Sequence, residues 1–576
     1  MKTGRFVAGP AAFLSRLSDP LIWQGGDWMV RGNMPAISLG QDGVILGTLF
    51  RRGDDLPLLR LSEAERHAIR DGGPAWLIRH VWGAYDAVLK DGAGRWGVLR
   101  DPSGMLPCYT VPAYGGALFG NDARSLFEAA GYPGSIAPDR LARFLAGVEL
   151  PFETCLADLD EILPGTFCSS LASAAQSCWH PAQFARGNSR ASGTSAAVLA
   201  RIVDRCVTAW AREAGQGIIG LSGGLDSSIV AALAAPHMAL EAFTMVGPDQ
   251  AGDERAFARL IADALALPLE PFFYKDCPID PGQPMLAHLP RPVAGLFFQA
   301  ISSAHAALGA EAPVLMAGNG GDHVFCTVRS AAPLVDRWRL EGPVPGLAAT
   351  ATDLARLTGV SVPAIVAEAL RIAQLPAERP SGRADRTGLA ELPDAWFEPS
   401  LHPWLQGLPD LPGKRRHVVQ LIQAGFAKEL YRQGSSLLQL TPLLSQPIVE
   451  YCLQVPSWMW IAGGVDRSLA RRAFEARLPP AIIDRRSKGG PDGFMQAYGK
   501  AHWQSLGDRL IGGCLDGLGL VERAWCRAPL EAGPGMRAQV DRRLRLVAAE
   551  AWAAAWSAPS IGADHASRSA RIRPPE

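Results

Sequence analysis

The pattern of apolar and polar positions changes part-way along the chain. Up to about Trp179, short alternating or apolar runs such as residues 28–30 and 44–47 are separated by Gly and Asp turns. This pattern predicts an antiparallel, β-rich domain. The same interpretation covers residues 76–100, where Asp91, Gly92 and Gly94 mark a hairpin turn. We also expect helices at residues 122–126 and 138–146.

A different pattern begins after a small, polar stretch at residues 182–195, which predicts a linker. Apolar residues then recur at spacings of three and four, as in an amphipathic helix: Leu199, Ile202, Val203, Cys206 and Trp210. Expected strands at residues 217–221, 240–246 and 313–317 alternate with a helix at 254–265, which predicts a parallel sheet flanked by helices. The remainder to about residue 555 is predicted to be mostly helical.

These patterns predict an α/β multidomain protein with four segments. They are an antiparallel α+β domain at 1–181, the linker at 182–195, a parallel α/β domain with extra helices at 196–556, and a flexible polar tail at 557–576. A chain of 576 residues is also too long for one core.

Composition excludes several classes of function. Basic and acidic residues number 56 each, so no overall positive charge favours nucleic-acid binding. We find no apolar run of about 18 residues and no signal-peptide pattern, and therefore expect a cytoplasmic protein without a membrane anchor. The ten cysteines form no C-x-x-C pair. We expect Cys108, Cys206, Cys326 and Cys452 to be small core residues.

The clearest candidate for chemistry is an S-G-G-x-D-S motif between an expected strand and an expected helix. Backbone N–H groups, hydroxyls and a helix N-terminus meet at such a turn, and together they bind phosphate. The spacing is neither that of a Walker loop nor that of a dinucleotide fingerprint. It is the spacing of the pyrophosphate loop of ATP pyrophosphatases. The candidate ligands of the pyrophosphate are Ser222, Gly223, Gly224, Ser227 and Ser228, and Asp226 is the candidate ligand of Mg²⁺. The alternative is an ordinary strand-to-helix turn.

Two further segments extend this candidate site. Gly318 and Asn319 begin a glycine loop after an expected strand, and Asp322 in that loop is a second candidate Mg²⁺ ligand. Lys488, in a chain poor in lysine, lies between glycine and arginine residues. Its cation could neutralise charge on the α-phosphate as pyrophosphate leaves. A structural turn and a basic surface loop are the respective alternatives.

In this order the motifs resemble the asparagine-synthetase superfamily. The matching segments in the second half of the chain are the two glycine loops, the acidic helix start at Asp253 and Glu254, and residues 441–450 and 488–493. The matching segments upstream are residues 99–109, 119–122 and 163–165. The resemblance implies an amidotransferase-like domain of the N-terminal-nucleophile (Ntn) type followed by an ATP-pyrophosphatase (HUP-like) domain. It implies ATP and Mg²⁺ as cofactors, with catalytic residues Lys488, Asn319, Asp226 and Asp322 and metal ligands Asp226 and Asp322. The implied nucleotide-binding residues are Leu221, Ser222, Gly223, Gly224, Leu225, Asp226, Ser227, Ser228, Val246, Gly318 and Lys488.

Several positions depart from the family pattern. A glutaminase of this type needs Cys after the initiator Met, whereas this sequence has Lys2, so we expect no ammonia production from glutamine. Asn319 stands where asparagine synthetases have an acid and β-lactam synthetases have a tyrosine. An amide can orient a nucleophile but cannot act as its base. The family glutamate before the 441–450 segment aligns near Leu438.

These departures are similar to those of the lasso-peptide macrolactam synthetases. That resemblance implies adenylation of an Asp or Glu side chain in a precursor core peptide, followed by attack of the peptide's own N-terminal amine. It also implies two protein partners, a leader peptidase and a leader-recognition protein. His323 is a further candidate proton acceptor. Asparagine or β-lactam synthesis on a small molecule, and an inactive nucleotide-binding scaffold, are the alternatives.

Overall fold

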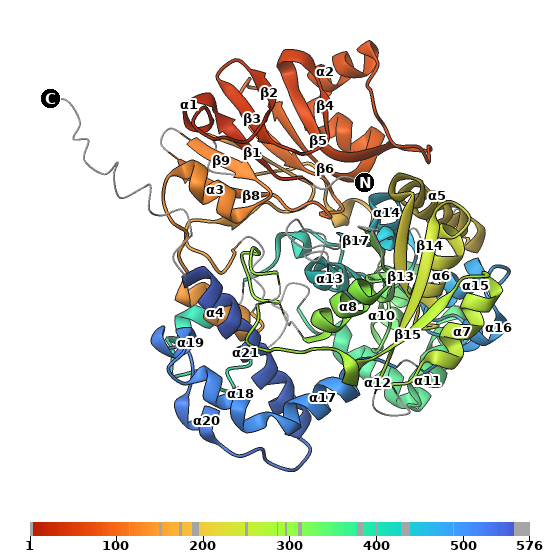
Figure 1. The fold of residues 1–576 in the computed structure, drawn as a ribbon. Helices are drawn as coiled ribbons and strands as arrows, with labels where there is room; N and C mark the ends of the chain where they lie inside the picture. The colour runs from red at the N-terminus through yellow and green to blue at the C-terminus, as the bar shows by residue number, and fades with distance from the viewer. Residues whose placement is uncertain are drawn as a thin grey trace.

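The chain folds into an antiparallel β-sandwich that lies on a larger α/β part (Figure 1). The computed structural model describes residues 4–113, 116–148, 153–171, 175–186, 195–247, 252–284, 286–293, 296–308, 314–376, 384–398, 400–427, 438–487 and 489–557. Its antiparallel N-terminal and parallel C-terminal sheets confirm the predicted fold class, an Ntn-like followed by a HUP-like domain. Most of the predicted linker and the predicted tail from residue 558 lie outside the described residues.

The N-terminal part contains two six-stranded sheets. Their strands are β1 (Phe6–Pro10), β2 (Leu21–Gly25), β3 (Trp28–Gly32), β4 (Ala36–Ser38), β5 (Gly43–Arg51), β6 (Val81–Lys90), β7 (Trp96–Arg100), β8 (Tyr109–Ala113), β9 (Gly116–Gly120), β10 (Asp160–Glu161), β11 (Thr166–Ser169) and β12 (Gln176–Ser177). One sheet has the order β10-β8-β9-β1-β3-β2 and the other β12-β11-β7-β6-β5-β4. The helices of this part are α1 (Ala11–Leu14), α2 (Glu63–His80), α3 (Ala123–Ala130) and α4 (Pro138–Leu145).

Helix α2 corrects the prediction that residues 76–100 are all β-structure, because residues 76–80 are helical. A capping box begins this helix: Glu65 donates its backbone N–H to the Ser62 hydroxyl at 3.2 Å, and Ser62 donates its own N–H to the Glu65 carboxylate at 2.7 Å. The helix kinks at Gly73, whose φ is +56°, and continues from Pro74. The S-x-x-E signal was present in the sequence, but the glycine and proline obscured it.

The C-terminal part is built around five parallel strands. They are β13 (Gln216–Gly220), β14 (Ala239–Val246), β15 (Leu269–Phe273), β16 (Val314–Met316) and β17 (Leu438–Leu440), in the order β15-β14-β13-β16-β17. The chain adds β14 and β15 on one side of β13 and then crosses to add β16 and β17 on the other side. The strand order therefore reverses between β13 and β16, which is the topological switch point of the sheet. Helices α5 (Ala196–Ala214), α6 (Leu225–Ala234), α7 (Arg255–Ala264) and α8 (Leu296–Ala307) accompany these strands. The predicted helix at 254–265 and strand at 240–246 are confirmed.

Most of the remaining described chain is helical, as predicted. The helices are α9 (Gly321–Val324), α10 (Ala332–Glu341), α11 (Gly346–Thr358), α12 (Val362–Ala373), α13 (Pro412–Ala427), α14 (Gln446–Gln454), α15 (Ser468–Phe474), α16 (Pro480–Asp484), α17 (Asp492–Ala501), α18 (Trp503–Leu510), α19 (Cys514–Gly517), α20 (Arg523–Arg527) and α21 (Met536–Ser557). Among the described residues, no helix is both long enough and apolar enough to cross a membrane.

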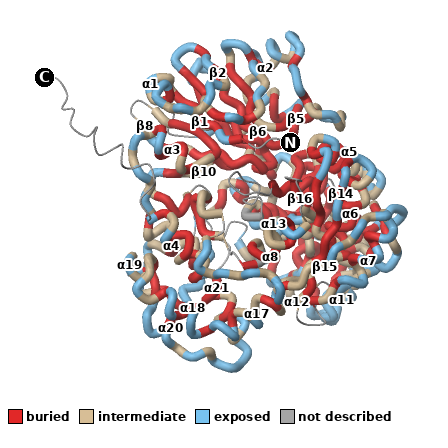
Figure 2. Tube along the Cα trace, viewed as in Figure 1, coloured by how far each residue is buried: buried red, intermediate tan, exposed pale blue. Residues whose placement is uncertain are grey.

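Apolar side chains continue from the sandwich into the α/β part. Phe50 and Trp82 of the second sheet lie edge-on to Trp210 of α5, with ring centroids 5.0 and 6.2 Å apart. The buried positions accordingly run without a break across the junction (Figure 2). Cys108, Cys206, Cys326 and Cys452 are all buried, as predicted.

A buried carboxylate ties the two parts together. Glu450 of α14 accepts hydrogen bonds from both terminal nitrogens of Arg52 at 2.7 and 2.9 Å and from the Trp179 indole at 2.9 Å. Gln446 donates a further bond at 2.8 Å. The Glu450 side chain is only 9% exposed, so removing it would strand donors from both parts of the chain.

We predict that Glu450→Ala lowers the free energy of unfolding by about 2–3 kcal/mol, since Arg52, Trp179 and Gln446 all lose an acceptor. Urea unfolding measures the change. The matched control is Glu368→Ala, which breaks an ion pair with Arg371 whose side chains are 39% and 60% exposed. This control should leave the midpoint unchanged, and an equal shift in the two variants would contradict the structural role of Glu450.

Candidate active site

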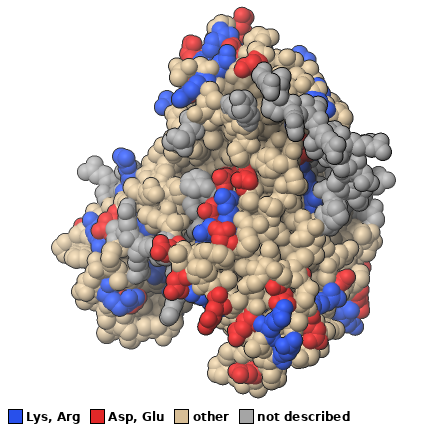
Figure 3. Space-filling model, turned by 90° about the vertical axis from the view of Figure 1, so that its left-hand side faces the viewer, with Lys and Arg blue, Asp and Glu red and all other residues tan. Residues whose placement is uncertain are grey.

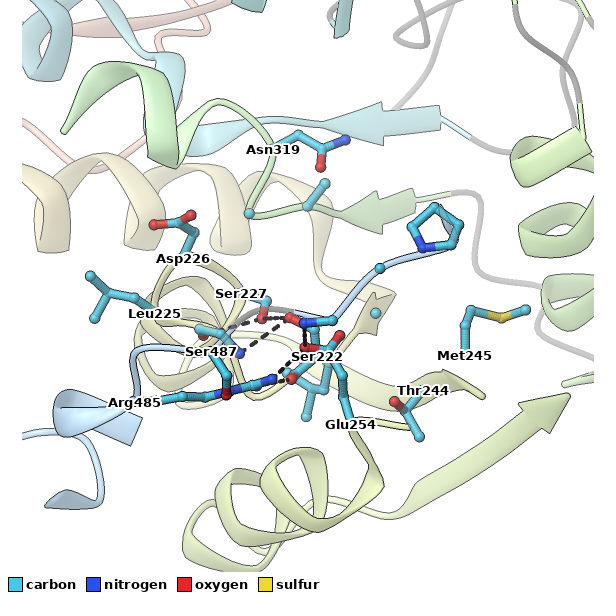
Figure 4. A pocket seen from close by; sticks show the side chains of 18 of the residues that line it. Ser222, Leu225, Asp226, Ser227, Thr244, Met245, Glu254, Asn319, Arg485 and Ser487 are labelled. Carbon is cyan, nitrogen blue, oxygen red and sulfur yellow. Dashed lines mark hydrogen bonds and ion pairs between the residues drawn. The ribbon is translucent and has the colours of Figure 1, made fainter. Parts of the chain in front are cut away.

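A cavity of about 710 Å³ opens at the carboxyl ends of β13, β14 and β16, at the switch point of the sheet (Figure 4). Its wall includes six of the predicted residues of the first loop and two of the second: Leu221, Ser222, Gly224, Leu225, Asp226, Ser227, Gly318 and Asn319. Thr244, Met245 and Leu315 add a more apolar region. The two loops predicted from separate motifs thus meet at one cavity.

The first loop forms a tight turn that leads into α6. The Ser222 and Ser227 hydroxyl oxygens lie 3.2 Å apart, and Gly224 donates its N–H to Ser222 Oγ at 3.2 Å. Gly223 has φ +61°, and a Cβ there would lie 2.3 Å from Phe257 Cβ, so only glycine fits. The hydroxyls and N–H groups at this helix start form a suitable cradle for an anion.

The second loop packs directly on the first. A Cβ at Gly318 would lie 2.5 Å from the Ser227 backbone nitrogen, and one at Gly321 would lie 2.3 Å from the Asp226 carboxyl carbon. These two glycines are therefore required for contact between the loops. Asn319, between them in sequence, is exposed and lines the cavity.

The two predicted metal ligands, Asp226 and Asp322, share one arginine. Arg467 Nη1 lies 2.9 Å from an Asp226 oxygen and 2.5 Å from an Asp322 oxygen, and its Nε lies 2.9 Å from Asp466. Burial alone would lower the pKa of the Arg467 guanidinium, but the three carboxylates outweigh burial and raise that pKa. Arg467 also has φ +53°, a conformation that is unfavourable for a residue with a side chain. The fold thus places a cation between the carboxylates at some conformational cost.

These carboxylates also fit a magnesium site of the kind that is completed by a nucleotide. Mg²⁺ in phosphate-transfer sites is held by one or two carboxylates, phosphate oxygens and water. Asp226 and Asp322 supply hard oxygen ligands at one point, as their shared contact with Arg467 shows. Among the described residues, no group of three or more His, Cys, Asp or Glu side chains converges on a metal position. Most ligands of the ion would therefore come from phosphate and water.

Lys488 lies outside the described residues, but the residues beside it are fixed against the first loop. Arg485 donates to the Ser222 carbonyl at 2.7 Å and to Glu254 at 2.6 Å, and its guanidinium lies 4.0 Å from the centre of the Phe257 ring. Gly489 donates its N–H to the same Glu254 oxygen at 2.9 Å. Glu254 therefore holds both flanks of Lys488 near the phosphate cradle (Figure 4).

Five predicted residues that the structure describes do not line this cavity. Ser228 and Val246 are buried, with 0% and 4% exposure, and Gly223 packs on Phe257. Asp322 reaches the site through Arg467. His323, the candidate proton acceptor, is also absent from the cavity wall.

Sequence reasoning missed several side chains that surround the cavity. Arginines exceed acids on the wall: Arg356, Arg467, Arg471, Arg485 and Arg486 face Asp226, Glu254 and Asp466. This surplus of positive charge favours a polyphosphate ligand. Gln439 of β17 also lines the cavity; the residue is 5% exposed, and its Nε2 has no hydrogen-bond partner among the described residues. Arg485 lies three residues before the predicted Lys488, so the sequence pointed to its segment, but no local pattern marked Gln439 or Arg467.

A parallel sheet with two glycine-rich loops and paired carboxylates at its switch point defines a nucleotide-binding α/β domain. A model of the asparagine synthase family matches residues 199–557. That match covers more than half of the 576 residues, and the chain belongs to the asparagine synthase family. Family members are ATP-dependent ligases that form amide bonds, and the chain is a ligase of this general class. The comparison with curated proteins gave no match.

We predict that Arg467→Met lowers the thermal unfolding midpoint by several degrees in metal-free buffer, because Asp226 and Asp322 then lose the guanidinium that they share. Added Mg²⁺ should raise the midpoint more in this variant than in the wild type. Thermal unfolding with and without Mg²⁺ measures both effects. Arg509→Met, which removes a partly exposed arginine 3.5 Å from Asp280, is the control and should do neither. An equal Mg²⁺ response in all three proteins would count against a shared cation position.

Proposed function

We propose that the protein is an ATP-dependent macrolactam synthetase acting on a peptide. It adenylates an Asp or Glu side chain of a precursor core peptide, and the peptide's N-terminal amine then closes an isopeptide ring. The observation that carries this proposal is Asn319, an exposed amide on the cavity wall at a position where a base would be needed to deprotonate a separate amine. An amine tethered to the acyl group depends more on position than on a base.

The two half-reactions use different parts of the cavity. In the first, a carboxylate oxygen of the peptide attacks the α-phosphorus of ATP, and the bond to the departing pyrophosphate breaks. The Ser222 and Ser227 hydroxyls, which lie 3.2 Å apart, and the N–H groups at the start of α6 would hold that pyrophosphate. Asp226 and Asp322 would hold Mg²⁺, which supplies charge neutralisation on the phosphates when it is bound.

In the second half-reaction, the amine nitrogen attacks the acyl carbon, and AMP leaves with the bond electrons. The proton lost by nitrogen passes to water or to phosphate. Asn319 orients the amine by a hydrogen bond from nitrogen to its side-chain oxygen. Gln439, whose Nε2 has no hydrogen-bond partner within the described part of the chain, would donate to a substrate carbonyl. Lys488, as predicted from the sequence, would stabilise charge on the α-phosphate.

Glutaminase chemistry has little support in the N-terminal sandwich. Its described cysteines are Cys108, Cys155, Cys168 and Cys178. Burial raises the pKa of the Cys108, Cys168 and Cys178 thiols, which disfavours the nucleophilic thiolate. Cys155 is 2% exposed. An amine from the peptide itself removes the need for ammonia, and a leader peptidase with a leader-recognition protein would liberate that amine.

The direct test uses a mixture of synthetic peptides, each with a free N-terminal amine and a single Asp or Glu at a different distance from it. With ATP and Mg²⁺, we expect at least one product lighter by one water, together with AMP. Asp226→Asn should lower AMP release at least ~100-fold, and the control Asp394→Asn, at a side chain that is 93% exposed, should not. ADP formation would contradict the proposal, as would amidation of free aspartate by ammonia in place of ring closure. Unchanged AMP release in Asp226→Asn would also contradict it.

A second prediction separates the half-reactions. Asn319→Ala should slow ring closure by about 10- to 100-fold, because the amine loses its orienting acceptor. ATP–pyrophosphate exchange, which reports adenylation alone, should change far less. Equal losses in both assays would place Asn319 in adenylation and overturn its role toward the amine.

A further inference from the structure

A second cavity of about 720 Å³ lies beside the first, between the sandwich and the C-terminal helices. Its wall draws Arg100 and Leu163 from the sandwich, Phe144 from α4, Leu421 from α13 and Arg545 from α21. In Figure 1, α4 and α21 lie on one side of this region and α13 on the other. Phe298 of α8 lines both cavities, so the two spaces meet at one side chain.

The wall of the second cavity is largely apolar. Its large side chains include Phe144, Val148, Phe298, Trp404, Leu421 and Ile422. His402, also on the wall, accepts a hydrogen bond at Nδ1 from the backbone N–H of Trp404 (3.1 Å), and burial lowers the pKa of His402 to about 4. His402 is therefore a neutral ring with its proton on Nε2. Such a wall fits aliphatic and aromatic side chains rather than a nucleotide phosphate.

The charged groups of this wall are mostly satisfied within the protein, with one exception. Glu161 binds Arg100 and Arg291, each at 2.7 Å, and Arg140 pairs with Asp160 at 2.9 Å. Arg545 is exposed and forms no ion pair or hydrogen bond within the part of the chain that the structure describes. The face of the molecule seen in Figure 3 carries charged side chains of both signs among mostly neutral ones.

We infer that the second cavity binds the segment of the peptide that follows the activated Asp or Glu, with the peptide's terminal carboxylate at Arg545. This inference rests on the proposed function. A ring closed between the N-terminal amine and an internal side chain leaves the rest of the peptide outside the ring. The first cavity must hold ATP and the reacting groups, and the second offers adjoining space with apolar walls and the exposed guanidinium of Arg545.

The test places a photoreactive benzoylphenylalanine at Ala548, which lies on the wall of the second cavity, and at Ala538, an exposed alanine on the same helix that lines neither cavity. The synthetic peptide mixture is added without ATP, once as free acids and once as C-terminal carboxamides. We expect the free acids to label position 548 several-fold more than position 538. Labelling at 548 should fall several-fold with the carboxamides and with Arg545→Gln. Equal labelling by acids and carboxamides, or no preference for position 548, would overturn the inference.

A second variant guards against disturbance by the photoreactive group. Ala548→Trp narrows the second cavity and should reduce ring closure about 10-fold or more while leaving the ATP-induced rise in thermal midpoint unchanged. Ring closure at the wild-type rate in Ala548→Trp would overturn the inference and leave the proposed function intact. If labelling at position 548 depends on the carboxylate but no peptide loses water and no AMP forms, the proposed function is overturned and the inference about the second cavity stands. If neither the labelling preference nor ring closure is observed, both proposals are overturned.

Discussion

The site depends on two carboxylates that the fold brings to one point. Gly318 and Gly321 leave no room for a Cβ against Ser227 and Asp226, so the second loop lies directly on the start of α6. That contact places Asp226 and Asp322 within reach of the same guanidinium. Two like charges so close need a cation, and Arg467 supplies it from a left-handed backbone conformation. A bound metal ion would serve the same electrostatic purpose, and it would free Arg467 for the phosphates.

The N-terminal sandwich is part of the same mechanical unit as the site. Phe50 and Trp82 pack on α5, the helix that leads directly into β13 and hence into the first loop. Glu450 of α14 adds a polar contact across the same junction, and α14 follows β17, which contributes Gln439 to the cavity. Loss of any catalytic role in the sandwich would therefore not make it dispensable. Its removal would expose large aromatic side chains and leave Glu450 without Arg52 and Trp179.

The sequence predicted those features whose signals are local. Strand β14, helices α5 and α7 and both glycine loops carry their periodicity or motif within a few residues. Arg467 meets Asp226 across 241 positions of sequence and Arg485 meets Glu254 across 231, and no periodicity encodes such contacts. The contact between the loops that Gly318 and Gly321 allow was not predicted, since the resemblance marked Gly318 only as a nucleotide-binding residue. Helix α2 was missed for a different reason, since its capping box is local but Gly73 and Pro74 interrupt its pattern.

Asn319 gives the proposed reaction its energetic logic. A general base contributes typically ~10²–10⁴-fold, or about 3–5 kcal/mol, to a proton transfer. Holding amine and acyl group together in one molecule contributes about 7–11 kcal/mol when the geometry is right. A protein that positions both groups can therefore lack the base, provided that it restrains the rest of the substrate. This condition is hard to meet for a flexible peptide held only at its reacting carboxylate, because each free backbone residue retains about 1–2 kcal/mol of conformational entropy. A second contact, to the part of the peptide outside the ring, would remove part of that conformational freedom before the amine attacks. Ring closure without a base at Asn319 therefore requires a binding space such as the second cavity, on the far side of Phe298.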